Sequence, residues 1–313
     1  MTRYDRDIVS WTSMIIAYVE NAPGHHALQL FREFNHLSLG SPSHFMLSSA
    51  INACARLGSL GSGKITHGVV IHLGYDVNVV ISSALVEMYC KCGSVVYSNK
   101  VFKRITNPSV ITFSSMIFGA ANCGHGILSL EHFQEMIDKR IKPNNVTFVA
   151  ILHACASLGS LVSGKITHGV VTRLGYDADE VISSALVDMY GKCGSVDYSN
   201  KVFRRIPNPS VIDFTSMIAS AARCGHGILS LELFQEMIDK GIKPDVTTFA
   251  AVLHACASLG ILGFGEIIHG MVIRLGYDAE MHLWTCMANV VMSTSQTRYL
   301  GESFILQQLI LIQ

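Results

Sequence analysis

The chain has 313 residues, and its 23 Lys+Arg balance its 23 Asp+Glu, so the formal net charge is zero. There is therefore no overall basic excess that would indicate a nucleic-acid partner, although basic residues could still cluster locally into a track. Half of the residues are apolar, but acidic residues interrupt the longest apolar stretches, which argues against a membrane-spanning helix and favours a soluble protein. The nine cysteines form no C-x-x-C pair, so we expect buried thiols in a reducing compartment rather than a zinc site.

The first residues resemble neither a signal peptide nor a transit peptide. Repeat-like sequence begins within about ten residues of Met1. We therefore expect a truncated chain or a misassigned gene start.

The chain repeats itself with a shift of 101 residues. "NACARLG" at 52–58 returns as "HACASLG" at 153–159 and 254–260, and "NPSVI" at 107 returns at 208. Each period divides into segments of 35, 31 and 35 residues, and each segment holds two apolar-periodic stretches around a turn that contains glycine. Such a segment is a helical hairpin, which buries its apolar face only by stacking on its neighbours. The pattern predicts sixteen helices in an all-α solenoid.

Eight repeat units follow one another along the chain. Their approximate bounds are 8–43, 44–78, 79–109, 110–144, 145–179, 180–210, 211–245 and 246–280.

Three stretches, "DIVSWTSMI" (7–15), "LVDMYGKCGSVDYSNKVF" (186–203) and "FQEMIDKGIKPD" (234–245), resemble the pentatricopeptide repeat family. The alternating unit lengths resemble its plant PLS subclass, whereas tetratricopeptide repeats keep one 34-residue period. The resemblance covers residues 5–280. It implies a right-handed α-solenoid that binds single-stranded RNA at one nucleotide per repeat. It also implies a role in RNA editing or processing in a mitochondrion or chloroplast, with a separate enzyme as catalyst.

One stripe runs along the first helix of each unit. It reads Ile212, Thr215, Ala219, Arg223 in one unit and Val181, Ser184, Asp188, Lys192 in the unit before. Earlier versions are Val80, Ser83, Glu87, Lys91 and Ile111, Ser114, Phe118, Asn122. A polar edge beside the core would explain the stripe equally well from the residues alone. By resemblance, the aliphatic residue packs on a base, the hydroxyl and the last residue of the unit read the base edge, and the cation meets a phosphate.

The resemblance also assigns base-reading pairs. Ser114 with Asn144 favours adenine and Thr215 with Asp245 favours guanine, which gives the element A-x-x-G when the chain runs parallel to the RNA. Thr12 would pair with Ser43, but an extra residue in that unit leaves the partner open. The readout of Ser83 with Ser109 and of Ser184 with Ser210 is also open, because a serine replaces the usual acid. Ser48, Val149 and Ala250 occupy the remaining reading positions, and the last two cannot bond a base, so their units act as spacers.

Other motifs carry no chemistry. "GSLGSGKI" (58–65) resembles a phosphate-binding loop, but it lacks the hydroxyl that Mg²⁺ requires and lies between two helices. His67, His168 and His269 recur singly and are interpreted as structural. No deaminase signature is present. We expect no enzymatic activity, cofactor or metal, and a monomer that contacts RNA but no membrane. A protein-binding scaffold and a non-functional gene fragment stay as alternatives.

The repeat pattern stops at residue 281. One nucleotide sequence can encode 281–295 in one frame and A-L-V-D-M-Y-G-K-C-G-N-V-D-E in another, and the second reading continues the repeat. We therefore interpret 281–313 as a frameshifted tail, which has not been selected to dock on the solenoid.

Overall fold

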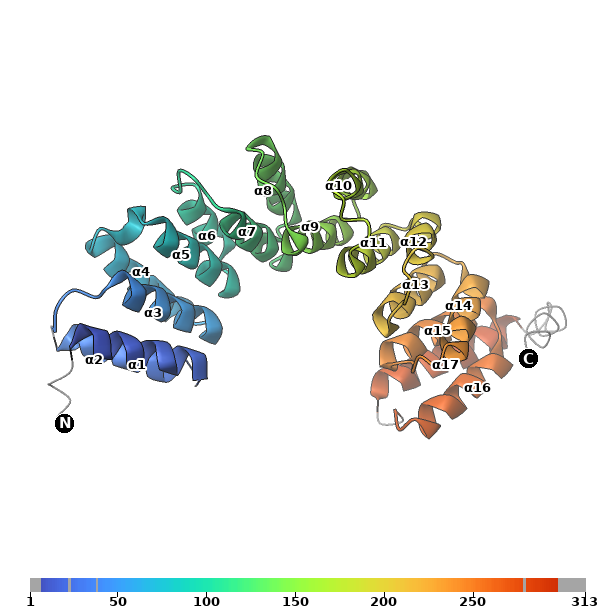
Figure 1. Ribbon diagram of the computed structural model, residues 1–313. Helices are drawn as coiled ribbons and strands as arrows, with labels where there is room; N and C mark the ends of the chain where they lie inside the picture. Colours follow the sequence, from blue (N-terminus) through green and yellow to red (C-terminus); the bar gives the residue numbers. More distant parts are fainter. Residues whose placement is uncertain (1–6, 22–23, 38, 278–279, 298–313) are drawn as a thin grey trace. The chain divides into compact units, whose positions relative to one another are not determined.

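A computed structural model describes residues 7–21, 24–37, 39–277 and 280–297, and these residues form helices and connections without strands (Figure 1). The first four repeat units contain α1 (Ile8–Asn21), α2 (His25–His36), α3 (His44–Leu57), α4 (Leu60–His72), the short 3-10 helix η1 (Tyr75–Val77), α5 (Val79–Lys91), α6 (Val95–Phe102), α7 (Val110–Asn122) and α8 (Gly126–Asp138). The next four contain α9 (Asn145–Leu158), α10 (Leu161–Arg173), α11 (Glu180–Lys192), α12 (Val196–Phe203), α13 (Val211–Arg223), α14 (Gly227–Asp239), α15 (Val246–Leu259) and α16 (Leu262–Arg274). Sixteen α-helices therefore fill the eight units within the described residues, which confirms the all-α repeat fold.

The chain divides into two compact bodies, one up to Ala154 and one from Cys155. In the N-terminal body the first helices α1, α3, α5 and α7 pack in succession, and α2, α4, α6 and α8 each pack on the first helix of their own unit. In the C-terminal body α11, α13 and α15 pack in succession with α12, α14 and α16 beside them. Each body thus places its first helices next to one another.

Aromatic side chains at the fourth position of the first helices form much of the core. Phe113 and Phe214 are completely buried, and each meets a phenylalanine of the preceding unit, Phe102 or Phe203, edge-on at 5.0 Å between ring centroids. Burying such a ring contributes about 1.5–3 kcal/mol. A hairpin alone would leave these rings in water, so this packing drives the stacking of the units.

The turns inside the hairpins have the predicted conformation. Gly194 and Gly225 have φ angles of 75° and 79°, in the left-handed region that glycine adopts without strain. The amide of the residue after Gly225 donates back to the Ala221 carbonyl oxygen at 2.9 Å, which satisfies the end of α13. The chain then reverses into the second helix.

The two periods differ in the contact made by a buried asparagine oxygen. In the N-terminal body His132 Nε2 lies 3.1 Å from Asn99 Oδ1. One period later Leu233 occupies the position of His132, and the buried Oδ1 of Asn200 has no hydrogen-bond partner in the described part of the chain.

The segment after the repeats folds differently from our expectation. Residues of the interpreted tail form α17 (Met281–Thr297), which packs on α15 and α16. Leu283 is 2% and Val290 0% exposed, because side chains seven residues apart face the same side of a helix. The expectation that this segment does not dock is therefore wrong for 281–297, whereas 298–313 lies outside the described residues. The frameshift itself stays a hypothesis.

Candidate nucleic-acid interface

The second residue of the first helix is a solvent-exposed apolar side chain in seven of the eight units. Val80, Ile111, Val181 and Ile212 are 64%, 66%, 61% and 67% exposed. Val9, Phe45 and Val146 occupy the same position and are also exposed. Leaving each of these side chains in water forgoes about 1.5–3 kcal/mol of burial. Exposed apolar groups therefore recur at one helical position along the repeats.

In three units the hydroxyl three residues further on is bonded to the following unit. Three such hydroxyls bond a threonine at the third position of the next first helix: Ser83 to Thr112 at 2.7 Å, Ser114 to Thr147 at 2.7 Å and Thr215 to Thr248 at 2.6 Å. These threonines are buried and were missed in the sequence. In the sequence, each of these threonines follows the residue that caps its helix (Ser109, Asn144 or Asp245) by three positions, and this spacing could have identified them.

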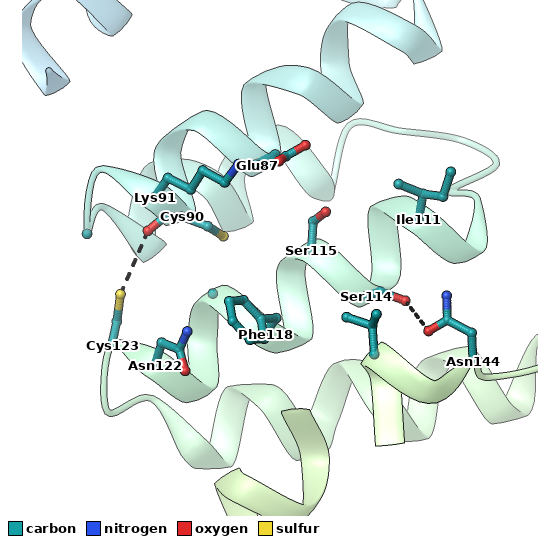
Figure 2. A pocket seen from close by; sticks show the side chains of 13 residues that line it. Glu87, Cys90, Lys91, Ile111, Ser114, Ser115, Phe118, Asn122, Cys123 and Asn144 are labelled. Atoms are coloured by element: carbon teal, nitrogen blue, oxygen red, sulfur yellow. Dashed lines mark hydrogen bonds and ion pairs between the residues drawn. The ribbon is translucent and has the colours of Figure 1, made fainter. Parts of the chain in front are cut away.

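Ser114 and Asn144 come together as predicted. Asn144 precedes α9, and its Oδ1 accepts hydrogen bonds from the Thr147 amide at 2.9 Å, from Thr147 Oγ1 at 2.9 Å and from Ser114 Oγ at 3.3 Å. Figure 2 shows the amide nitrogen of Asn144 directed away from Ser114. Because the capping bonds use the oxygen, the amide group offers its two N–H donors to a ligand.

Thr215 and Asp245 are joined through a third residue. Asp245 caps α15, and its Oδ1 accepts from the Thr248 amide, Thr248 Oγ1 and Thr247 Oγ1, each at 2.7 Å. Burial opposes ionisation of Asp245, but the hydrogen bonds from Thr247 and Thr248 together outweigh it and hold its pKa below the usual 3.8. The carboxylate is therefore ionised at neutral pH and acts only as an acceptor.

The remaining predicted pairs are arranged differently. Thr12 donates to the Ile8 carbonyl oxygen at 2.7 Å, while Ser43 caps α3 by accepting from the Met46 amide at 3.2 Å, and no hydrogen bond joins Thr12 to Ser43 within the described residues. Ser184 donates to the Glu180 carbonyl oxygen at 2.9 Å.

Ser210, the predicted partner of Ser184, bonds Asp213 instead. In the earlier 31-residue unit Ser83 and Ser109 both approach Thr112, at 2.7 and 3.0 Å between hydroxyl oxygens.

The three predicted phosphate-binding cations are not equivalent. Lys91 pairs with Glu87 at 2.7 Å and Lys192 with Asp188 at 2.8 Å, each four residues earlier on the same helix. Arg223 donates to the Ala219 carbonyl oxygen at 3.3 Å and has no carboxylate within 4.0 Å among the described residues. Arg223 therefore offers an uncompensated positive charge, whereas a phosphate at the two lysines must compete with a carboxylate.

A cavity of about 570 Å³ gathers one complete set of these groups. Ile111, Ser114 and Asn144 line it together with Lys91 from α5 and Val146 from α9 (Figure 2). The volume is typical of sites for small organic groups. Its walls combine apolar side chains with a hydroxyl, an amide and a cation, which suits a planar ring that carries polar edges and an attached anion.

The described residues contain no group of three or more side chains suited to a metal ion, and none of their helices is long and apolar enough to cross a bilayer. His67 and His168 have the structural role predicted for them, because their Nδ1 atoms lie 2.8 Å from the hydroxyls of Tyr89 and Tyr190.

Stacked helical hairpins whose first helices pack in succession within each body define an α-solenoid repeat protein. Three segments match sequence models of known repeats: residues 9–36 match the PPR repeat, 103–157 the pentatricopeptide repeat domain and 209–258 the PPR repeat family. The chain belongs to the pentatricopeptide repeat family.

Similar curated proteins are pentatricopeptide repeat-containing proteins of Arabidopsis thaliana. One is 32% identical over 95% of this chain and 41% of its own length, and another is 34% identical over 91% of this chain and 47% of its own length. The chain thus spans less than half of either relative. Other relatives are named as chloroplastic, at 32% identity over 91% of this chain and 35% of the relative, or mitochondrial, at 33% over 86% and 43%.

Among solved structures, the pentatricopeptide repeat protein PPR10 in complex with an 18-nt psaJ RNA element has a similar fold. The TM-score is 0.78 at 17% identity, over 92% of this chain and 43% of that one. At this identity the likeness establishes the fold alone.

Proposed function

We propose that the chain binds single-stranded RNA along its first helices, with one nucleotide at each repeat unit. The observation that carries the proposal is the row of exposed aliphatic side chains, each followed three residues later by a residue at the reading position. Bases offer flat apolar faces to the first group and hydrogen-bonding edges to the polar residues at the second. The RNA complex of PPR10 supports the proposal at the level of the fold.

In the cavity of the N-terminal body each group has a distinct task. Ile111 and Val146 cover the two faces of a base, while Ser114 and the amide of Asn144 meet its edge. The two N–H donors of Asn144 suit the ring-nitrogen acceptor of adenine. Lys91 can contact the phosphate once the phosphate replaces Glu87 as its ion-pair partner.

In the unit 211–245 the ionised Asp245 offers hydrogen-bond acceptors, whereas Asn144 offers donors. An acceptor-only carboxylate favours the N1–H and N2–H₂ donors of guanine. Because the adenine-reading and guanine-reading units are separated by two others, the preferred element contains A-x-x-G.

The substitution Asp245→Asn tests this readout. Asparagine caps a helix as well as aspartate does, so folding should be retained while a donor replaces the acceptor. We expect the preference at the fourth nucleotide to move from guanine toward adenine by about 1 kcal/mol, the value of one hydrogen bond. Affinities of both proteins for A-x-x-G and A-x-x-A RNAs measure it. Equal binding of both RNAs by both proteins would show that Thr215 and Asp245 do not read a base.

We further propose that the chain belongs to the PLS subclass and acts in RNA editing or processing in an organelle, with a separate enzyme supplying the chemistry. The alternating 35- and 31-residue units and the chloroplastic and mitochondrial relatives support this assignment. Targeting of the full-length protein, fused to a fluorescent reporter in plant cells, tests the location.

A further inference from the structure

The junction between the units 180–210 and 211–245 carries a carboxylate where three other junctions carry a threonine. Asp213 stands at the third position of α13, which Thr112, Thr147 and Thr248 occupy in three other first helices. Ser210 caps this helix, and Asp213 completes a reciprocal capping box with it. At α15 the carboxylate and the hydroxyl have exchanged places: Asp245 is the cap and Thr248 stands at the third position. The acid has thus moved by three residues while the capping box is preserved.

The exchange changes which groups are available at the surface. Asp213 Oδ2 accepts from the Ser210 amide and the Ser210 hydroxyl, both at 2.7 Å. The hydroxyl proton of Ser210 is therefore committed to Asp213. Ser210, the residue that the family pattern assigns to base reading, cannot donate to a base without breaking its capping bond.

The second carboxylate oxygen of Asp213 is unused. Asp213 is 3% exposed, and its buried Oδ1 has no hydrogen-bond partner in the described part of the chain. A buried acceptor without a donor is destabilising, and a charged one more so. At the equivalent position of three other junctions, the threonine hydroxyl bonds the stripe hydroxyl of the preceding unit. Here that hydroxyl belongs to Ser184, which donates to its own helix as Ser83 and Ser114 do, but no hydrogen bond joins it to Asp213 within the described residues.

We infer that Asp213 sets the base preference of the unit 180–210 by acting through Ser184, an inference that rests on the proposed RNA binding. When a base enters, the Ser184 hydroxyl turns its proton from the Glu180 carbonyl oxygen toward Asp213 Oδ1. Asp213 then gains the donor it lacks, and the Ser184 oxygen meets the base as an acceptor beside a negative charge. This combination favours the base whose edge carries two adjacent donors, which is guanine. Asp213 is a positioning residue, because Ser184 makes the contact.

The unit 79–109 provides a matched control within the same chain. It has the same pair of serines, Ser83 and Ser109, but Thr112 follows them in place of the acid. We therefore expect no guanine preference at that unit, although its reading serines are identical. Exchanging the third residues, by Asp213→Thr and Thr112→Asp, should exchange the preferences of the two units.

The experiment measures equilibrium binding of the full chain to A-x-N-G RNAs that carry each of the four bases at N. The wild-type protein should bind the guanine version about fivefold more tightly than the others, as expected from one hydrogen bond. Asp213→Thr should lose this preference and keep the flanking A and G. Thr112→Asp should gain a guanine preference one nucleotide before the A.

Two outcomes would overturn the inference: equal binding of all four RNAs by the wild type, or an unchanged guanine preference in Asp213→Thr. If Asp213→Thr does not fold, the nearly isosteric Asp213→Asn decides, because its amide places a donor toward Ser184 and should abolish the preference. RNAs altered at the flanking A and G test the proposed function separately. Loss of discrimination there means that base reading itself is absent, whereas intact flanking discrimination with no effect of Asp213 refutes only this inference.

Discussion

Gly119 on α7 and Cys90 on α5 approach each other too closely for two side chains. A Cβ atom at Gly119 would overlap Cys90 Sγ and Cβ and lie 3.3 Å from Cys90 Cα. One period later the glycine is on the other helix: a Cβ at Gly191 would overlap Ser220 Oγ and lie 2.6 Å from Ser220 Cβ. The two helices therefore tolerate one side chain at this contact, on either side.

The substitution Gly119→Ala tests this packing. In an unobstructed helix, glycine to alanine stabilises by about 1 kcal/mol. At Gly119 the obstruction includes the backbone of α5, so overpacking should cost about 1–3 kcal/mol and produce net destabilisation of up to roughly 2 kcal/mol. Gly68→Ala is the control, because nothing lies within 4 Å of a Cβ at Gly68 in α4, and it should stabilise the protein.

The compensated variant Cys90→Gly/Gly119→Ser reproduces the arrangement of the second period. It moves one glycine from α7 to α5, so the helix-propensity terms nearly cancel and stability should stay within about 1 kcal/mol of the wild type. Urea midpoints followed by circular dichroism compare the variants, which avoids assuming two-state unfolding for a repeat array. A midpoint for Gly119→Ala as high as that of Gly68→Ala, or strictly additive effects in the double variant, would refute the packing argument.

Three further predictions concern charge, a buried amide and pH. Arg223→Ala should weaken binding to all single-stranded RNAs and lower the slope of log affinity against log salt by about 0.7. Glu87→Gln should instead strengthen binding, because it frees Lys91 for a phosphate. Unchanged salt titrations in both variants would contradict the proposed phosphate contacts. Asn99→Ala should cost about 1–3 kcal/mol in urea unfolding because it strands a buried histidine, while Asn200→Ala, which removes an acceptor without a partner, should be nearly neutral. Burial lowers the pKa of His67 below 6.5. The neutral imidazole therefore contributes its full stabilisation above pH 6.5, and this stabilisation is lost as the pH falls from 6.5 toward the lowered pKa. A melting temperature that does not decrease between pH 7.5 and 5 would contradict this prediction.

The helices, the unit boundaries and the stripe positions can all be predicted from the amino-acid sequence. These features depend on local periodicity, on left-handed glycines such as Gly225 and on the 3.6-residue turn, which are encoded over a few neighbouring residues. The pairing of Lys91 with Glu87 was also readable, because four residues separate them on one helix.

The residue that each stripe side chain contacts in the next unit becomes known only from the three-dimensional packing. Three features depend on contacts between residues of different units: the bond between Ser114 and Thr147, the burial of Asp213 and the close contact of Gly119 with Cys90. Their geometry follows from how closely successive first helices pack, which no local pattern specifies. The same reason explains α17: a segment outside the repeat pattern docks because Leu283 and Val290 fall on one helical face and α15 and α16 offer an apolar surface to cover.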